Sequence, residues 1–202
     1  MYKKLDIKIK VSLIFLLMFL ITAVLVQTKI LLKFDLLFYG KICSIRTEVL
    51  NVFMLFITNF GDVIAVLALA AISFTASIIF KVKNYSLEIL SISAFQHILN
   101  RIAKAVFQRE RLKEMILVEE SSYSFPSGHT MTAVVLWGFV IYLMLQYNYK
   151  KAAVIPLIII FMVGFSRIYL GAHYFTDVLG GFFLGIAILN IAIIIFEKIR
   201  KN

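Results

Sequence analysis

Two histidines and an aspartate are the residues of this sequence best suited to covalent chemistry. His173 and Asp177 are four positions apart in "SRIYLGAHYFTD", so they share one face of a helix. A carboxylate on one imidazole nitrogen fixes the tautomer and makes the other nitrogen a better nucleophile. His129, in "SFPSGHT", is placed to protonate a leaving oxygen and later to activate water. Together they predict two-step hydrolysis of a phosphate through a phosphohistidine.

Basic residues near these groups predict that the ligand is a phosphate. Arginine offers forked donors to phosphate oxygens, and lysine supplies a point charge. The "PSGH" turn adds Gly128, which permits close backbone approach, and a helix N-terminus, which favours an anion. Such groups neutralise the equatorial oxygens of a transferred phosphoryl group. The basic residues are Lys104, Arg109, Arg111 and Arg167.

A zinc site is the main chemical alternative, because two histidines and an aspartate are plausible zinc ligands. Against it, several fixed positive charges would share the site and repel a cation. The sequence also lacks a helical His-x-x-x-His pair. We therefore expect no metal and no other cofactor.

The composition places this chemistry in a membrane protein. The 202 residues are 62% hydrophobic with a mean hydropathy of +0.96, whereas soluble domains are about 45–50% apolar. A net charge of +10 raises the question of nucleic-acid binding, but the apolar bulk argues against it and favours anionic lipids and phosphates. The length suits one domain, 1–202. Cys43 has no partner for an internal disulfide and is interpreted as apolar filler.

Six segments are apolar enough, or nearly so, to cross a bilayer as helices. The first resembles a signal peptide but lacks a convincing cleavage site, so we expect a retained helix. The sequence thus predicts an all-α, polytopic membrane protein with six transmembrane helices. The predicted spans are 11–27, 63–80, 85–107, 129–148, 152–170 and 174–196.

Lysine and arginine in the short connections orient these spans. With both termini in the cytoplasm, the inner segments hold a narrow majority of the basic residues. The active site then lies at the outer face of the plasma membrane. Segment 28–62 becomes an outer connection that lies in the interface as an amphipathic helix. Its run "VLNVFMLFIT" is either a second interfacial helix or the start of a span broken near Gly61.

The third predicted span carries a polar stripe at steps of three or four residues. Ionisable groups in a span normally face the bundle interior, so the stripe indicates a wet or ion-paired cavity. Snorkelling of Lys104 and Arg111 to the outer interface is the alternative. His97 lies deeper and is interpreted as a hydrogen-bonded structural histidine. The stripe comprises His97, Asn100, Arg101, Lys104, Gln108 and Arg111.

Three blocks of this sequence resemble the signature of the type 2 phosphatidic acid phosphatase family. These integral-membrane lipid phosphatases share a core with bacterial acid phosphatases and vanadium haloperoxidases. The first block, a lysine, six residues, arginine and proline, reads "KAVFQRERL", with Leu112 in place of the proline. The second is "PSGH". The third, serine-arginine, five residues, histidine, three residues and aspartate, is matched in full by "SRIYLGAHYFTD".

The resemblance implies a role for each matched position. His173 would be the nucleophile, Asp177 its partner and His129 the general acid, with no metal required. Loss of the proline would loosen Arg111 but removes no catalytic group. The implied phosphate-binding residues are Lys104, Arg111, Ser127, Gly128 and Arg167, with Arg109 as an accessory candidate.

The function predicted from these observations is metal-independent dephosphorylation of a membrane lipid phosphate or diphosphate. By family analogy the substrate is undecaprenyl diphosphate, phosphatidylglycerophosphate or phosphatidic acid. A phosphoryl transferase, passing the phosphate to another lipid or sugar, would use the same residues. A non-enzymatic binder or transporter of anionic lipid is a third hypothesis, but it has no use for the two histidines.

Two further features leave alternatives open. Glu119, Glu120 and Tyr123 either orient or reject a second phosphate, or are solvated loop residues, which is the simpler interpretation. Gly181 and Gly185 have the spacing of a helix-packing motif. Packing within the bundle and dimerisation explain that spacing equally well, so the oligomeric state stays open.

Overall fold

The computed structural model describes residues 2–200, with side chains from residue 5 onward. Within this part of the chain, all regular secondary structure is helical, which confirms the predicted all-α class. The elements are α1 (Tyr2–Gln27), α2 (Leu32–Cys43), α3 (Glu48–Thr58), the 3-10 helix η1 (Asn59–Gly61), α4 (Val63–Phe80), α5 (Ser86–Phe107), α6 (Gly128–Gln146), α7 (Val154–Tyr169) and α8 (Phe175–Ile199).

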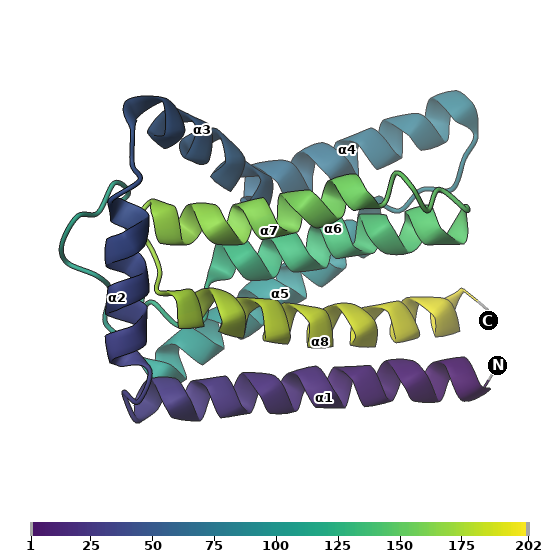
Figure 1. Cartoon of the computed structure of the whole chain (residues 1–202). Coiled ribbons are helices and arrows are strands. Elements are labelled where there is room, and N and C mark those ends of the chain that lie inside the picture. The colour runs from purple at the N-terminus through teal and green to yellow at the C-terminus, as the bar shows by residue number, and fades with distance from the viewer. Residues whose placement is uncertain (1, 201–202) are drawn as a thin grey trace.

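In the part of the chain that the structure describes, four helices are long and apolar enough to cross a membrane: α1, α4, α6 and α8. The third and fifth predicted spans correspond to α5 and α7, which lie in the same bundle (Figure 1). They do not meet the same standard, because α5 carries the polar stripe and α7 has only 16 residues. The chain is thus an integral membrane protein with multiple helical spans.

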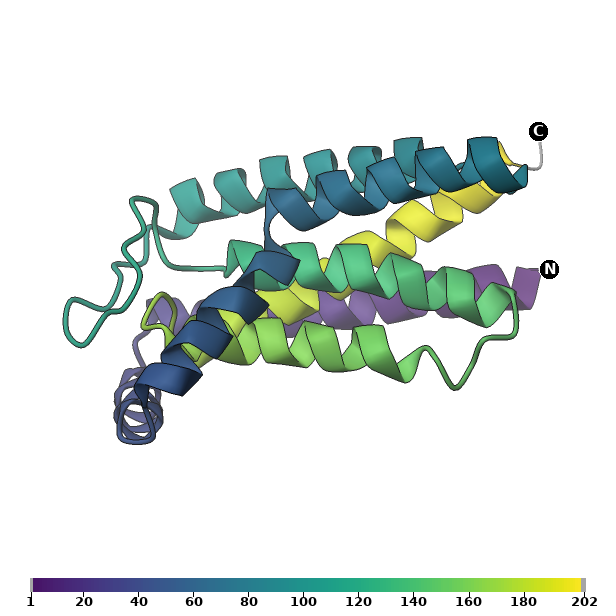
Figure 2. The same ribbon diagram turned by 90° about the horizontal axis from the view of Figure 1, so that it is seen from above.

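The bundle has two different ends. Figure 1 shows that α1 begins and α8 ends at one end, while α2 lies across the opposite end. Along the bundle, α1 packs against α8, and α6 packs against both α7 and α8. Figure 2 shows the connection 108–127 extending beyond the α2 end. The starts of α6 and α8 and the end of α5 therefore meet where α2 crosses.

Segment 28–62 forms two helices rather than one. α2 lies across the bundle end, and α3 packs on α7 and leads into η1. η1 ends at Gly61, and α4 begins two residues later at Val63. A Cβ atom at Gly61 would lie 2.7 Å from the carbonyl oxygen of His129. Glycine at this position therefore lets η1 pack directly against the start of α6.

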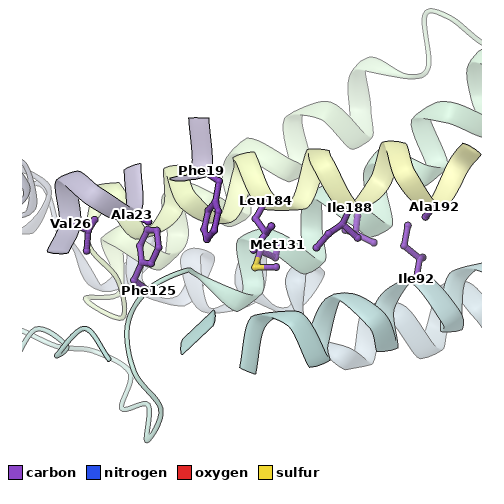
Figure 3. Close-up of a cluster of buried hydrophobic side chains, with 10 residues drawn as sticks. Phe19, Ala23, Val26, Ile92, Phe125, Met131, Leu184, Ile188 and Ala192 are labelled. Carbon is purple, nitrogen blue, oxygen red and sulfur yellow. The ribbon is translucent and has the colours of Figure 1, made fainter. Parts of the chain in front are cut away.

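A buried apolar cluster anchors the chain just before the "PSGH" turn. Phe125 precedes that turn, and its ring stacks on Phe19 of α1 with centroids 5.6 Å apart. The packing thus holds the start of α6 in place. Figure 3 shows the cluster, which includes Phe19, Ala23, Val26, Ile92, Phe125, Met131, Leu184, Ile188 and Ala192.

Glycines of α8 bring this helix close to α6. A Cβ atom at Gly181 would lie 2.7 Å from the carbonyl oxygen of Ser127, and one at Gly185 would lie 3.0 Å from Val134. The spacing noted in the sequence is therefore used for packing within the bundle. The close approach also brings Asp177 beside the "PSGH" turn, where the backbone N–H of Ser127 donates to the Asp177 carbonyl at 3.0 Å.

The polar stripe of α5 does not form one uniform face. Asn100 is buried and donates a hydrogen bond to the carbonyl oxygen of Pro126 at 3.1 Å. His97 and Arg101 are exposed and line a cavity between α4 and α5. The interpretation of His97 as a hydrogen-bonded structural histidine was therefore wrong, because its exposed side chain faces that cavity and has no hydrogen-bond partner among the described residues.

Candidate active site

His173 lies in the short connection between α7 and α8, with its side chain buried. Its Nδ1 atom is 3.4 Å from Oδ2 of Asp177, one helical turn later. On the other side, its Nε2 atom is 3.5 Å from a guanidinium nitrogen of Arg111. The backbone N–H of His173 donates to the carbonyl oxygen of Arg167 at 3.2 Å. The imidazole is thus held with one nitrogen toward a carboxylate and the other toward the basic residues.

The protonation state of His173 suits a nucleophile. Burial lowers the pKa of its imidazole to about 3, although the hydrogen bond and charge of Asp177 act in the opposite direction. The ring is therefore neutral near pH 7. A neutral imidazole has a free lone pair on one nitrogen, which attack on phosphorus requires.

Asp177 is held by several donors at the start of α8. It is fully buried, and Oδ2 accepts hydrogen bonds from the backbone N–H of Tyr174 at 2.9 Å and from the hydroxyl of Ser124. Ser124 was not a candidate in the sequence, although it begins the "SFPSGHT" stretch. These bonds fix the carboxylate beside His173 before any ligand arrives.

Arg109 faces the carboxylates rather than the other basic residues. One guanidinium nitrogen donates to Oδ1 of Asp177 at 2.6 Å and the other to Oδ2 of Asp35 at 2.7 Å. The guanidinium carbon lies 3.9 Å from the ring centre of Tyr174. Burial opposes the charge of Arg109, but Asp177 and Asp35 outweigh burial and raise its pKa. The expected convergence of Arg109 on a phosphate is therefore not what the structure shows.

Arg167 reaches the site from the end of α7. Its side chain is 1% exposed, and its guanidinium donates to the hydroxyl of Thr58 at 2.8 Å and to the carboxylate of Glu120. Its Nε atom is buried and has no hydrogen-bond partner among the described residues. An unsatisfied buried donor is costly, and a phosphate oxygen is a suitable acceptor for it.

Arg111 and Lys104 complete the basic part of the site. Arg111 donates to the backbone carbonyls of Ala172 and Ser122, and Lys104 donates to the hydroxyl of Ser122 at 2.8 Å. Burial lowers the pKa of Arg111, while Glu120 opposes that shift. Leu112, which replaces the family's proline, is buried in an apolar cluster. Packing of Leu112 and the hydrogen bonds of Arg111 are thus the contacts of this stretch, where the family has a proline.

Glu120 belongs to the site, because its carboxylate contacts Arg167 and lies 4.0 Å from Arg111. The simpler interpretation, a solvated loop residue, was wrong for Glu120. The same interpretation agrees with the exposed positions of Glu119 and Tyr123. A loop carboxylate thus neutralises the most deeply buried base of the site.

The "PSGH" residues divide between structure and cavity. Ser127 is buried, its backbone N–H is used by Asp177, and its hydroxyl accepts from Thr130 at 2.9 Å. Gly128 and His129 begin α6 and line the cavity. The first N–H groups of a helix have no partner within it, so this turn offers donors to an anion. His129 also lies within electrostatic range of His173 and Arg167.

Two cavities meet at Arg101, Lys104 and Glu120, which line both. One, of about 870 Å³, runs between α4, α5 and α6 and is lined by Lys104, Glu120, Gly128 and His129. The other, of about 680 Å³, lies beside the connection 108–127. Within the described residues, no three His, Cys, Asp or Glu side chains form a group that could hold a metal ion. The cavities have the size of a small-molecule or head-group site.

Comparison with known proteins extends the resemblance beyond the three blocks. Residues 63–201 match the PAP2 superfamily. Phosphatidylglycerophosphatase B of Bacillus subtilis is 32% identical over 191 residues, which cover 92% of this chain and 94% of that protein.

Solved structures agree with this match. The crystal structure of a transmembrane PAP2 type phosphatidylglycerolphosphate phosphatase from Bacillus subtilis has a TM-score of 0.87 at 32% identity, covering 93% of this chain and 96% of that one. LpxE of Aquifex aeolicus has the same fold, with a TM-score of 0.61 at 24% identity over 78% of this chain and 93% of that chain. The hypothesis of a non-enzymatic lipid binder is set aside. The chain belongs to the PAP2 superfamily and is an integral-membrane lipid phosphatase of that family.

Proposed function

We propose that this phosphatase removes the terminal phosphate of phosphatidylglycerophosphate, releasing phosphatidylglycerol and inorganic phosphate. The observation that carries the proposal is the position of His173, which lies between Asp177 on one side and Arg111 on the other. The likeness to the Bacillus subtilis enzyme over nearly the whole chain supports this choice of substrate.

The proposed reaction has two steps. In the first, Nε2 of His173 attacks phosphorus; the N–P bond forms as the bond from phosphorus to the lipid oxygen breaks. His129 gives its proton to that oxygen. In the second, His129 takes a proton from water, whose oxygen attacks phosphorus, and the N–P bond breaks to release inorganic phosphate.

We propose that phosphate oxygens replace the Glu120 carboxylate as the partner of Arg167. Arg167 would then satisfy its unpartnered Nε with a phosphate oxygen. Arg111, Lys104 and the first N–H groups of α6 at Gly128 would contact the remaining oxygens. Ser127 contributes by holding α6 against α8.

Arg101 supports a substrate with a second anionic group. It is exposed on α5, one turn before Lys104, and it lines both cavities. Phosphatidylglycerophosphate carries a phosphodiester a few bonds from its terminal phosphate, whereas phosphatidic acid has only one phosphate. We propose that Arg101 binds this phosphodiester.

The proposed membrane arrangement has six spans in a single domain, 1–202. In it, α5 and α7 cross the plasma membrane with α1, α4, α6 and α8, and the polar side of α5 borders the cavity rather than lipid. Both termini are cytoplasmic, the active site faces outside, and segment 28–62 lies at the outer interface. The distribution of basic residues in the connections supports this orientation.

A substrate panel tests the proposed activity. Purified protein in detergent micelles with EDTA is given phosphatidylglycerophosphate, phosphatidic acid or undecaprenyl diphosphate, and released phosphate is measured. We expect the highest kcat/KM for phosphatidylglycerophosphate. In the Arg101→Gln variant, KM for this lipid should rise about 10-fold, the scale of a hydrogen bond to a charged group, with KM for phosphatidic acid unchanged. Faster turnover of undecaprenyl diphosphate, or phosphate found on an acceptor lipid, would contradict the proposal.

Orientation is tested by cysteine labelling. In a Cys43→Ser background, Glu114→Cys places a thiol in the exposed connection 108–127. A membrane-impermeant maleimide should label it in intact cells. Labelling only after the membrane is permeabilised would place the active site inside.

A further inference from the structure

A buried carboxylate on α2 is joined to the site from outside the three sequence blocks. Asp35 is 0% exposed, although α2 lies across the end of the bundle (Figure 1). A buried carboxylate is unfavourable unless charges and hydrogen bonds compensate it. The residues that contact Asp35 therefore indicate its role.

The partners of Asp35 lie at the start of α8. Oδ2 accepts from the hydroxyl of Thr176 at 2.6 Å, and Oδ1 accepts from the Thr176 backbone N–H at 3.1 Å. Thr176 is the residue directly before Asp177. A carboxylate from α2 thus caps the helix that carries the partner of His173.

Arg109 connects the two carboxylates. Its guanidinium donates to Oδ2 of Asp35 at 2.7 Å and to Oδ1 of Asp177 at 2.6 Å. The other oxygen of Asp177 faces Nδ1 of His173 at 3.4 Å. Asp35 is therefore connected to His173 through three successive contacts, with Arg109 and Asp177 between them.

The charges explain why a second carboxylate matters. Attack by Nε2 leaves a positive charge on the imidazole ring, which Asp177 stabilises. Arg109 alone would cancel the charge of Asp177, whereas Asp35, Arg109 and Asp177 together carry one net negative charge. The positive groups Arg111 and Arg167 act on His173 from the other side. Asp35 thus preserves the field that favours the phosphorylated histidine.

We propose that Asp35 is a positioning residue for phosphoryl transfer, acting through Arg109 on the orientation and charge of Asp177. The inference rests on the proposed function of His173. It also gives segment 28–62 a role in the reaction, because α2 supplies the carboxylate.

Asp35→Asn in the full-length protein is the direct test, with Tyr39→Phe as the matched control. Tyr39 lies one turn later on α2, and its hydroxyl donates to the carbonyl oxygen of Met115, far from Asp177 in the bonding network. Each variant alters one side chain whose hydrogen bonds connect α2 to other parts of the chain. We expect Asp35→Asn to lower kcat about 10-fold, the scale seen when an orienting partner is removed, with KM and the stoichiometry of inorganic phosphate binding unchanged. Tyr39→Phe should retain wild-type kcat.

If Asp35→Asn does not fold, Arg109→Lys tests the same connection between the two carboxylates. A lysine keeps the charge but cannot bridge two carboxylates with a fork, so kcat should fall with KM unchanged. Wild-type kcat in either folded variant, or an equal loss in Tyr39→Phe, would overturn the inference. The assay uses whichever lipid phosphate the wild type hydrolyses best, so a wrong choice of head group does not affect it. A wild-type enzyme that releases no phosphate from any lipid would overturn the proposed function and this inference with it.

Discussion

His173 separates two regions of opposite character. On its Nδ1 side, Asp177, Arg109 and Asp35 are largely buried, and each is hydrogen-bonded to the others or to α8. On its Nε2 side, the buried Nε of Arg167 has no hydrogen-bond partner among the described residues. The charge of Arg167 is neutralised by Glu120, which lies in the connection 108–127. In the first region the charged side chains are paired with one another. In the second, Arg167 has a donor available for another acceptor.

The difference follows from what each side does during turnover. Groups that orient the nucleophile need no new partner, so fixing them in advance avoids reorganisation during the reaction. The phosphate must enter and leave in every cycle. In the proposed mechanism, phosphate displaces Glu120, the partly exposed loop carboxylate that pairs with the buried guanidinium of Arg167. Each prediction below alters one side of His173.

The largest effect is expected for His173→Ala. Without the imidazole there is no nucleophile, so kcat should fall at least about 10³-fold. Phosphate release measured on folded, monodisperse protein checks this. His97→Ala is the matched control, because His97 lines the cavity but lies outside the site, and it should keep near-wild-type kcat. Wild-type turnover by His173→Ala would refute the mechanism.

The next largest effect is expected for Arg167→Lys, among the groups proposed to bind phosphate. Lysine keeps the charge but loses the forked donors, so kcat should fall about 10²-fold, as when one transition-state donor is removed. Arg46→Lys serves as the control, since Arg46 binds the carbonyl oxygen of Tyr169 at the end of the same helix. That control should lower the melting temperature and leave kcat unchanged. Equal kcat for Arg167→Lys and the wild type would count against a phosphate at this position.

A smaller and opposite effect is expected for Glu120→Gln. Removing the carboxylate that competes for Arg167 should tighten inhibition by inorganic phosphate about 3-fold, within the range of a partly exposed ion pair. The inhibition constant is the measurement, and exposed Glu119→Gln is the control. Weaker phosphate binding in Glu120→Gln would mean that this carboxylate helps to bind the ligand rather than to replace it.

The smallest effect concerns the pH dependence of the free energy of unfolding, which reports on the buried His173. Because burial lowers the pKa of His173 from 6.5 to about 3, the unfolded chain binds a proton in this window that the folded chain does not. The free energy of unfolding should therefore fall as the pH drops from 6.5 toward 3. Melting temperatures of the wild type and His173→Gln check this, and the variant should show the shallower slope. Parallel slopes would show that His173 is not buried in its neutral form.

The pairing of His173 with Asp177 was predictable because only three residues separate them, His173 just before α8 and Asp177 in its first turn. The same holds for "PSGH" at the start of α6, since a turn followed by an apolar run indicates a helix start. In each case the geometry depends on local backbone structure. The all-α class followed from the apolar segments for the same reason.

Asp35 and the orientation of Arg109 were not predictable, because they depend on contacts between segments far apart in the chain. Arg109 was grouped with Arg111 by proximity in sequence, yet Arg109 contacts Asp177 whereas Arg111 lies beside Nε2 of His173. An acidic residue in the apolar run "LLKFDLLFYG" was the available signal for Asp35. The role of Glu120 depends on a loop whose conformation no periodicity indicates.

The central claim is a phosphohistidine on His173, and rapid quenching into base tests it most directly, because the N–P bond survives base. Wild-type protein is mixed with the lipid phosphate, quenched within one turnover and mapped by peptide mass spectrometry. The mechanism predicts one added phosphoryl group, on the peptide that contains His173. It also predicts that acid removes the group and that His173→Ala lacks it. Hydrolysis by the wild type without such a peptide, or with the group on another residue, would contradict the claim.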